Sequence, residues 1–441
     1  MVKQTVATAP GSDVYAGGPV YCLGGRSTVW GLYAPRIFKE KHEKHFPPNI
    51  SDYLEQGGYE KALELLTNGS QTFTTIYPSN EINANETTYA EGHLNEAIKK
   101  FYQSIGKHSK PKVELSALAS QFRSEKVYNF PQGAYSTVDY LLDRTYQRDP
   151  NLTILLNTEV LTVSKAADTG KLGLKIRSSS NDKTYQVSAK TIILSAGTIG
   201  TARIALSSGL QRHIPLVGKG LTDHDIWGVR FHMKLDKKLN DPLKLQCRLL
   251  VGGEDVLLNV AINANSFLAR EFTGSHYFDE GGNLHHGPPP AGEEYDTVNI
   301  TIETQALLVD SNEVVDIPSR EPVIRMKRRA RDSNTAKQEK MQDQMQDLAT
   351  LIGKALGLGP VAKAPRLTRA GLGAVAHEVG TMRMEGRHDK DFVVDKNLQV
   401  RGYDGLYVCD LSIFPFSPPA NPSLTLAAIA LQLADRLTEM K

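Results

Sequence analysis

Histidine is the side chain best suited to acid–base chemistry near neutral pH, and the sequence contains 12 of them. A histidine that faced a hydroxyl group could remove its proton, and His377 is the candidate for that role. Taken alone, a single histidine more often has a structural role. Two histidine pairs, His42 with His45 and His285 with His286, lack the i, i+4 spacing of a helical zinc site. We therefore exclude a metal hydrolase and expect no metal site.

Composition narrows the classes of function. The chain has 441 residues, enough for two or three domains, and 40% of them are hydrophobic, so it can bury a large core without crosslinks. Its 51 Lys and Arg against 49 Asp and Glu leave a formal charge of +2, which does not suit nucleic-acid binding. No run approaches ~18 consecutive apolar residues, so we expect no membrane span. The oligomeric state is left open.

The cellular compartment is only weakly indicated by the sequence. The three cysteines, Cys22, Cys247 and Cys409, cannot pair evenly, and their wide spacing fits no zinc or redox motif. The first 20 residues lack the apolar centre of a secretion signal. The location stays unknown, with the cytoplasm as the default expectation.

The middle of the chain shows a strand, turn and helix pattern. Residues 151–163 and 190–195 are predicted strands, and the second is expected to be buried on both faces. A turn at Ala196–Gly197 follows, and residues 201–208 are predicted to form a short helix closed by Gly209. This unit indicates an α/β domain.

The C-terminal residues supply the elements closest to His377. Residues 406–409 are predicted to form a short buried strand that ends at Asp410. A long apolar helix is predicted over 423–437, with Asn421 as its N-cap and Pro422 at its first helical position. The two predicted elements extend the α/β domain to the end of the chain.

The remaining segments suggest a second lobe. Gly24–Gly31 indicates a tight turn and helix start, and residues 39–125 carry mixed helical patterns typical of a variable cap. Residues 335–358 look helical. Alternating strands that favour an antiparallel sheet are predicted at 256–267, 298–309 and 322–330.

Four blocks of sequence follow one another in a consistent order. They are Leu23–Gly31 (LGGRSTVWG), Asn157–Val160 with Thr191–Gly209, Val217–His224 (VGKGLTDH), and His377–Met384 (HEVGTMRM) continued through Val393–Leu398 and Leu406–Thr425. Together they resemble the glucose-methanol-choline (GMC) family of flavoprotein oxidoreductases, and the first block is most similar to pyranose oxidase-like members. The resemblance implies FAD as the cofactor and oxidation of a CH–OH group, with hydride transfer to flavin N5. The implied substrate is an alcohol or a sugar-like compound.

The resemblance also implies catalytic roles. His377 corresponds to the catalytic base of the family, which faces the flavin. Asn421, 44 positions further on, corresponds to the His or Asn that hydrogen-bonds the substrate oxygen beside the base. Asn421 could instead only cap the terminal helix, and the two roles are compatible.

The family pattern further implies residues that contact FAD. The positive end of the C-terminal helix would favour the negative charge of a reduced flavin ring. The flavin would be lined by Gly24, Gly25, Ser27 and Thr28, and Pro422 and Ser423 would lie near its pyrimidine ring. Asp410 would lie near the ribityl chain and the phosphates. The backbone of Val160 would hold the adenine, and Ala196 and Gly197 would lie close to the nucleotide half of FAD.

The sequence departs from the family in two respects. Val29 stands where some relatives carry a histidine that tethers the flavin, so non-covalent binding is expected. The family also opens with a Gly-x-Gly-x-x-Gly unit that seats the pyrophosphate, and this unit is missing, since Gly371–Ala376 (GLGAVA) is better interpreted as a glycine-rich loop. A shortened sequence, weak FAD binding or a complementing partner chain would each explain this, and we favour the first. An exposed sheet edge is then expected.

The predicted architecture is an α/β protein with a split FAD-binding domain of the GMC type, incomplete at its N-terminus, and a substrate lobe of helices and an antiparallel sheet. Residues 1–38, 136–235 and 365–441 are assigned to the FAD domain, and 39–135 and 236–364 to the substrate lobe. An alternative function is a non-catalytic remnant that binds flavin poorly and serves as a binding module. The sequence identifies neither the alcohol nor the electron acceptor.

Overall fold

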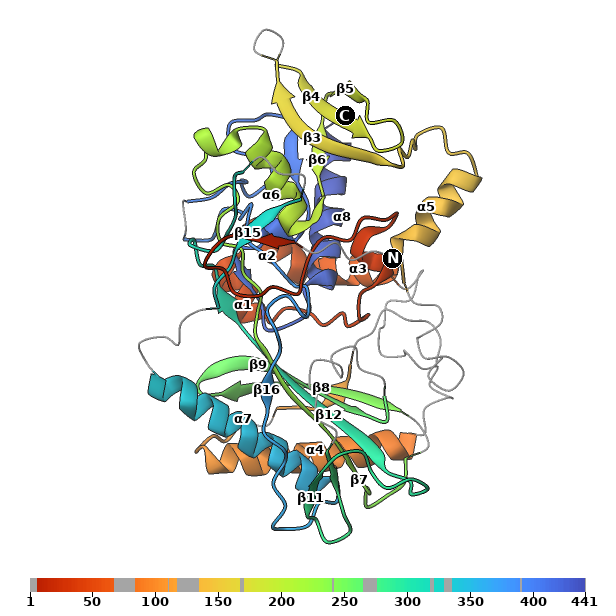
Figure 1. The fold of residues 1–441 in the computed structure, drawn as a ribbon, viewed down its shortest axis with the longest axis vertical. Helices are drawn as coiled ribbons and strands as arrows, with labels where there is room; N and C mark the ends of the chain where they lie inside the picture. Colours follow the sequence, from red (N-terminus) through yellow and green to blue (C-terminus); the bar gives the residue numbers. More distant parts are fainter. Residues whose placement is uncertain are drawn as a thin grey trace.

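The computed structural model describes the chain in ten stretches, which are residues 6–66, 84–109, 111–116, 135–166, 170–239, 242–264, 276–317, 321–328, 335–388 and 391–440. Its elements form two lobes, of which the upper one in Figure 1 holds both the N-terminal turn and the C-terminal helix. The lower lobe is built around one large sheet (Figure 1). The mixed α/β class predicted from the sequence is observed.

A parallel strand pair forms the centre of the upper lobe. β6 (Ile192–Leu194) pairs with β17 (Leu406–Val408), and helix α6 (Gly197–Ser207) begins directly after β6. Gly197 makes this sharp turn with a φ of 79°, a conformation that favours glycine. The long helix α8 (Ser423–Glu439) packs into the same core through Leu424, Ala428, Ile429 and Leu433.

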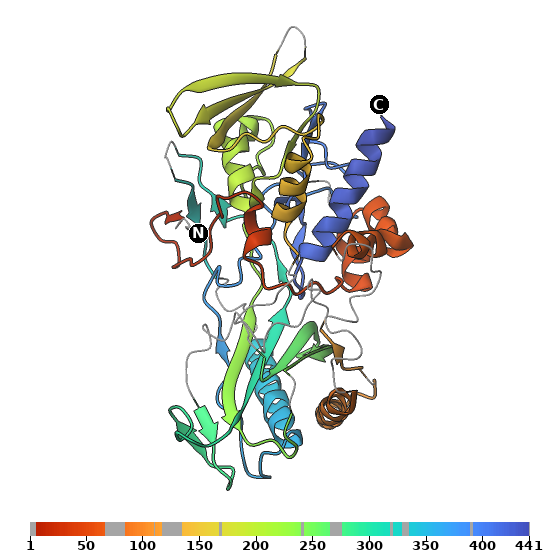
Figure 2. The same ribbon diagram turned by 90° about the vertical axis from the view of Figure 1, so that its right-hand side faces the viewer.

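Small sheets surround this pair. Strands β3 (Thr158–Lys165), β4 (Leu172–Ser178) and β5 (Thr184–Ala189) form an antiparallel sheet, visible at the top of Figure 2. A second small sheet joins β1 (Ala7–Thr8), β15 (Val323–Arg325) and β14 (Glu313–Val314). A third pairs β13 (Ala306–Leu307) with β18 (Phe416–Ser417), so distant parts of the chain meet in this lobe.

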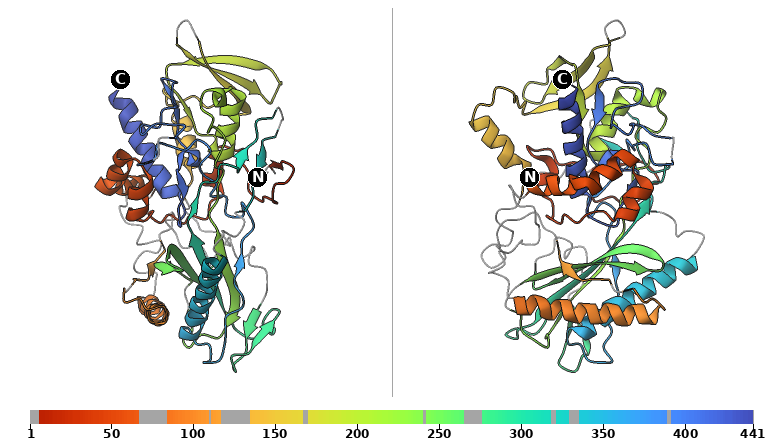
Figure 3. Two further views of the ribbon diagram at one scale, coloured as in Figure 1. Left: turned by 90° about the vertical axis from the view of Figure 1, so that its left-hand side faces the viewer. Right: turned by 180° about the vertical axis from the view of Figure 1, so that it is seen from behind.

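The lower lobe contains an eight-stranded sheet. Its four longest strands lie side by side, each antiparallel to its neighbour, and most of their residues are buried. In order across the sheet they are β7 (Ile226–Met233), β12 (Asp296–Thr304), β9 (Glu254–Ile262) and β8 (Leu243–Val251). Shorter strands at its borders are β2 (Glu114–Leu115), β10 (His276–Phe278), β11 (Leu284–His286) and β16 (Thr368–Arg369). Helices α4 (Ala84–Ser104) and α7 (Thr335–Ala355) pack on each other and share a core with this sheet (Figure 3).

The helices near the N-terminus divide differently from the predicted lobes. α1 (Lys39–His45), α2 (Pro48–Tyr53) and α3 (Tyr59–Leu66) share the upper core, and α3 packs on α8, whereas α4 belongs to the lower core. The predicted segment 39–135 is therefore split between two cores. β7 and β16, which fall in segments assigned to the FAD domain, pair within the large sheet of the lower lobe.

Several local predictions need correction. Ile193 of β6 is 45% exposed rather than buried, because β6 bonds only to β17 within the described residues and leaves one edge and face open. The strand predicted from 151 begins at Thr158, and the helix predicted from 201 begins at Gly197. Segment 322–330 contributes β15 to the small upper sheet rather than to the large one. By contrast, the helix predicted over 335–358 is confirmed as α7.

The cysteines differ in their surroundings. Cys22 is exposed, whereas burial raises the pKa of the Cys247 and Cys409 thiols to about 12. Within the described residues, no helix combines the length and apolar character that crossing a bilayer requires.

Candidate active site

His377 and Asn421 lie within hydrogen-bond distance of one another. The Asn421 Nδ2 and His377 Nε2 atoms are 3.2 Å apart, although the residues are 44 positions apart in the sequence. Asn421 does not cap α8, because Pro422 occupies the N-cap position and no side chain bonds there. The predicted cap is therefore wrong by one residue, and the Asn421 amide turns toward the histidine instead. The other amide atom, Oδ1, is buried without a hydrogen-bond partner.

A second histidine fixes the proton positions on His377. His224 Nδ1 lies 2.6 Å from the carbonyl oxygen of Pro418, which can only accept, so this nitrogen carries the proton. His224 Nε2 is then the acceptor for His377 Nδ1 at 3.1 Å. His377 therefore carries its proton on Nδ1 and keeps the Nε2 lone pair, which accepts from Asn421.

Burial keeps both histidines neutral. It lowers the pKa of His224 to about 4, although the Pro418 carbonyl and Asp225 act in the opposite direction. It also lowers the pKa of His377 well below its ordinary value, and His224 and the charge of Arg26 add to the effect. The near-neutral pKa expected of a general base is therefore not what the isolated chain provides, although a neutral histidine is ready to accept a proton.

Arg26 connects the N-terminal turn to the loop that carries His377. Both of its terminal nitrogens donate to the fully buried carboxylate of Glu378, at 2.5 and 2.6 Å, and Tyr15 donates to the same carboxylate at 2.5 Å. Arg26 also donates to the carbonyl of Ala376, whose φ of 56° is a left-handed conformation that side chains disfavour. These contacts hold the residues on both sides of His377 and thereby fix its orientation.

Two opposing effects, burial and the charge of Arg26, determine the pKa of Glu378. Burial alone raises the pKa of Glu378, but Arg26 and the donated hydrogen bonds outweigh it, so the pKa is lowered. Glu378 is thus ionised and paired with Arg26. Its backbone carbonyl accepts from Thr198 Oγ1 at 2.5 Å, which brings the first turn of α6 to the same loop.

The predicted nucleotide residues converge at the ends of β6 and β17. Gly197 donates its backbone N–H to Asp410 Oδ2 at 2.9 Å, and Thr201 donates to the same oxygen at 2.5 Å. Ser412 donates to the other oxygen from its backbone N–H and its hydroxyl. Asp410 is 5% exposed, so its carboxylate lies inside the fold rather than on the surface. Its carboxylate ties the strand ends together, and Ala196 stands beside it with its N–H bonded to Thr201.

The Gly-Gly turn is a short 3-10 helix, η1 (Gly25–Thr28), packed beside α5 (Thr137–Tyr146). Gly24 and Gly25 have φ values of 83° and 54°, and a side chain on Gly25 would meet open space. Ser27 Oγ bonds to Gly24 and Thr137, and Thr28 Oγ1 bonds to Gly25. Cys22 lies at the same turn, with its sulfur 3.4 Å from Thr28 Oγ1.

Val160 is a predicted site residue that no hydrogen bond joins to the rest of the set within the described residues. It lies half-buried in β3, at the register shift of that strand, and packs against the upper core next to α6. Hydrogen bonds connect η1 and the start of α6 to the loop that carries His377, and His377 to Asn421 at the start of α8. The structure thus brings the other eleven predicted residues into one connected region, in which Pro422 and Ser423 form the start of α8 beside Asn421.

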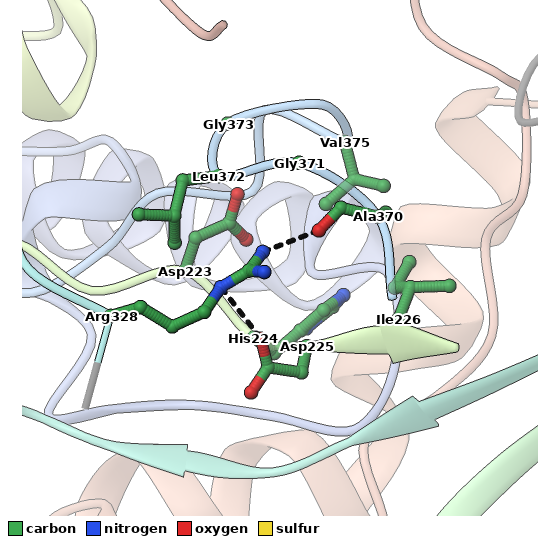
Figure 4. Close-up of a pocket in the computed structure, with 10 residues that line it drawn as sticks. All are labelled: Asp223, His224, Asp225, Ile226, Arg328, Ala370, Gly371, Leu372, Gly373 and Val375. Carbon is green, nitrogen blue, oxygen red and sulfur yellow. Dashed lines mark hydrogen bonds and ion pairs between the residues drawn. The ribbon is translucent and has the colours of Figure 1, made fainter. Parts of the chain in front are cut away.

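A small polar hollow of about 10 Å³, room for roughly one water molecule, lies beside this region. It is lined by Asp223, His224 and Arg328 together with the loop around Gly371–Gly373 (Figure 4). Burial, and then Glu378, raise the pKa of Asp223 well above its ordinary value, and neither of its carboxyl oxygens meets a donor with good geometry. Arg328 pairs with Asp225 at 3.9 Å.

Sequence reasoning missed His224, Glu378 and Arg26. Each of them lies inside a block that carried the resemblance. Glu378 follows His377 directly, and Arg26 lies between Gly25 and Ser27, whereas His224 has no predicted site residue nearby in the sequence. Their roles depend on contacts across 153 and 352 positions of the chain. An ionisable residue beside a predicted site residue is a signal that could have pointed to Glu378 and Arg26.

A split α/β lobe, an antiparallel sheet lobe and a neutral histidine held beside an asparagine form the arrangement expected of a flavoprotein oxidoreductase. Two family models described as GMC oxidoreductase match residues 23–226 and 310–430. The chain belongs to this family, and the predicted resemblance is confirmed.

Two characterised relatives share sequence with the chain. Choline oxidase of Arthrobacter globiformis is 25% identical over 328 residues, which is 68% of this chain and 58% of that protein. 5-(Hydroxymethyl)furfural oxidase of Methylovorus sp. (strain MP688) is 40% identical over 72 residues, which is 16% of this chain and 14% of that protein. The matched segments thus span less than two thirds of either relative.

Solved structures show the same fold. Pyridoxine 4-oxidase from Mesorbium loti has a TM-score of 0.58 at 15% identity, covering 98% of this chain and 87% of that one. The R554K variant of formate oxidase from Aspergillus oryzae RIB40 has a TM-score of 0.62 at 16% identity, with the same coverage. The predicted fold class is therefore confirmed.

Proposed function

We propose that the protein is an FAD-dependent oxidoreductase that acts on the CH–OH group of an alcohol or sugar-like substrate, with His377 as the base. The observation that carries the proposal is the hydrogen-bonded line from Pro418 through His224 to His377, which leaves the Nε2 lone pair of a neutral imidazole beside Asn421. A base must hold an unprotonated lone pair at a defined atom before a substrate arrives.

The residues present suit a flavin. Gly25 and Gly197 each have open space where a side chain would stand and positive φ values, so a ligand can approach their backbones closely. The Oδ1 atom of Asn421 is a buried polar atom that lacks a hydrogen-bond partner among the described residues. We assign cofactor contacts to the predicted set, which is Gly24, Gly25, Ser27, Thr28, Val160, Ala196, Gly197, Asp410, Pro422 and Ser423.

The residues of the chain would act as follows. A hydroxyl group of the substrate takes the place of the Asn421 N–H as the donor to His377 Nε2, and the Asn421 amide then donates to the same hydroxyl oxygen. His377 takes the hydroxyl proton while His224, held by Pro418, keeps the Nδ1 proton in place. The flavin, when bound, supplies the acceptor for the two electrons that leave the carbon. Because Val29 has no nucleophilic side chain, we propose non-covalent binding.

The alternative of a non-catalytic remnant is less well supported. The family models match both halves of the chain, and the histidine and asparagine remain within hydrogen-bond distance. A protein without turnover would not need a base in a defined tautomer. The electron acceptor and the particular alcohol are not assigned.

The first test is the absorbance spectrum of the purified chain before and after incubation with FAD. We expect flavin bands that stay with the protein after gel filtration and that bleach without oxygen when an alcohol is added. The panel would include choline, 5-(hydroxymethyl)furfural, pyridoxine and simple sugars. A chain that remains colourless and leaves the fluorescence of added FAD unchanged would contradict the proposed cofactor binding by this chain.

A matched pair of glycine variants makes this test specific. Gly25 and Gly402 have φ values of 54° and 80°, and an added side-chain carbon meets nothing within 4 Å at either position. Gly25→Ala and Gly402→Ala therefore cost similar backbone strain, about 1 kcal/mol. FAD affinity should fall only in Gly25→Ala, and an equal loss in both variants would contradict the assignment of the turn.

A further inference from the structure

A buried carboxyl group lies behind the two histidines. Glu303, near the end of β12, is 3% exposed, and its Oε2 atom lies 3.5 Å from His224 Nε2 without a hydrogen-bond partner in the described part of the chain. Its other oxygen accepts from Asn259 Nδ2 of β9 at 3.0 Å. Glu303 connects the large sheet of the lower lobe to the site in the upper lobe.

Glu303 and His377 approach the same atom. His224 Nε2 has one lone pair, and it accepts the His377 Nδ1 proton at 3.1 Å while Glu303 Oε2 stands at 3.5 Å. The charge on Glu303 therefore acts directly on the group that orients the base. When His377 takes a proton at Nε2, it becomes a cation that shares its Nδ1 proton with His224. A buried cation of this kind is costly unless a negative charge lies nearby.

We propose that Glu303 is a positioning residue whose ionisation stabilises the protonated His377–His224 pair and so sets the strength of the base. The inference rests on the proposed function, because it concerns the same base. The proton balance is simple. The substrate proton stays on His377, the Nδ1 proton stays between the two rings, and the carboxylate supplies the neutralising charge without receiving a proton itself.

The sign of the pH dependence follows from the surroundings of Glu303. Burial raises the pKa of Glu303 to about 8, and the hydrogen bond from Asn259 opposes the shift. The titratable group that faces Glu303 is His224, and His377 lies behind it. Asn259 of β9 also faces Glu303 but carries no charge. Asp225, which follows His224 in the sequence, is paired with Arg369 and Arg328. Glu303 is neutral below about pH 8 and negative above it, so the base strengthens as the pH rises through that value.

The inference can be tested without flavin. The full chain labelled with ¹⁵N-histidine would be titrated by NMR, with the ring signals assigned through His224→Gln and His377→Gln. The wild-type rings should respond in a step near pH 8. Glu303→Gln, which mimics the neutral carboxyl, should abolish the step, and Glu303→Asp should shift it without abolishing it. Glu114→Gln is the matched control, since Glu114 lies in the same sheet and bonds to Gln246.

Activity supplies the second readout. With a substrate in hand, the rate of flavin reduction should rise about tenfold through the same pH range in the wild type and in Glu114→Gln, and should stay flat in Glu303→Gln. A ring response that persists in Glu303→Gln, or that is absent from the wild type, overturns the inference. Failure of the proposed function looks different, because no alcohol would then reduce the flavin while the NMR step remained.

Discussion

Replacing His377 by alanine is expected to lower the rate of flavin reduction by about 10²- to 10⁴-fold, while FAD stays bound. The reason lies in the tautomer, because His377 Nε2 is the one atom with a lone pair that the line from Pro418 and His224 directs toward Asn421. Alanine removes this acceptor and leaves the cofactor contacts proposed above in place. Stopped-flow absorbance with excess alcohol measures the rate, and the visible spectrum measures bound flavin.

An exposed histidine serves as the control for this variant. His388 is exposed and lies eleven positions further on in the chain, and His388→Ala should reduce flavin at the wild-type rate. Added imidazole should restore part of the lost rate in His377→Ala, because it can enter the vacated space and accept the proton. Equal rates in His377→Ala and wild type would exclude His377 as the base.

Arg26→Met is expected to lower the free energy of unfolding by about 3 kcal/mol at neutral pH, which is the lower end of the range for breaking a buried ion pair. Glu378 has no exposed side-chain surface, while Arg26 is 34% exposed, which moderates the loss. The variant leaves a buried carboxylate that keeps the hydrogen bond from Tyr15 but loses both donors of the guanidinium group. Urea denaturation followed by circular dichroism measures the change.

The pH dependence of this loss separates charge from packing. In the wild type the pKa of Glu378 is lowered, so its contribution to stability is present above the ordinary value of 4.5 and is lost as the pH falls through the folded-state pKa. In Arg26→Met burial is no longer outweighed and raises this pKa. The destabilisation should therefore shrink toward pH 4.5, as Glu378 takes up a proton.

A surface ion pair provides the comparison. Arg325 pairs with Glu313 and is 43% exposed, so Arg325→Met should cost less than about 1 kcal/mol and show little pH dependence. If Arg26→Met and Arg325→Met lower the free energy of unfolding by the same amount at every pH, the Arg26–Glu378 pair stabilises the fold no more than a surface ion pair does.

The spacing of apolar residues along the chain predicted the helices and strands better than it predicted which strands pair with one another. The helix α7 follows from the pattern over 335–358, and β9 and β12 follow from two of the predicted strands, because burial of one face imposes a period that is visible along the chain. Segment 322–330 was assigned to the wrong sheet, since β15 pairs with β1, some 316 positions earlier. Nothing local encodes such a choice of partner.

The candidate site shows the same difference between residues that the sequence identifies and the partners with which they make contact. His377 and Asn421 could be found from the order of the sequence blocks, and their contact across 44 positions agrees with that expectation. The partners that fix them, His224 and Arg26, depend on distances that arise only when the lobes fold together. The lowered pKa of His377 could not be predicted either, because it results mainly from burial, which is a property of the fold rather than of the motif.

The exposed thiol of Cys22 gives the protein a natural labelling position. Cys247 and Cys409 have pKa values raised to about 12, so at neutral pH they hold almost no thiolate and react slowly with maleimides. A fluorophore would therefore attach at Cys22, within contact distance of Thr28 in the Gly-Gly turn. Its emission would report the arrival of a ligand at that turn in the unmutated chain, including a ligand that is itself colourless.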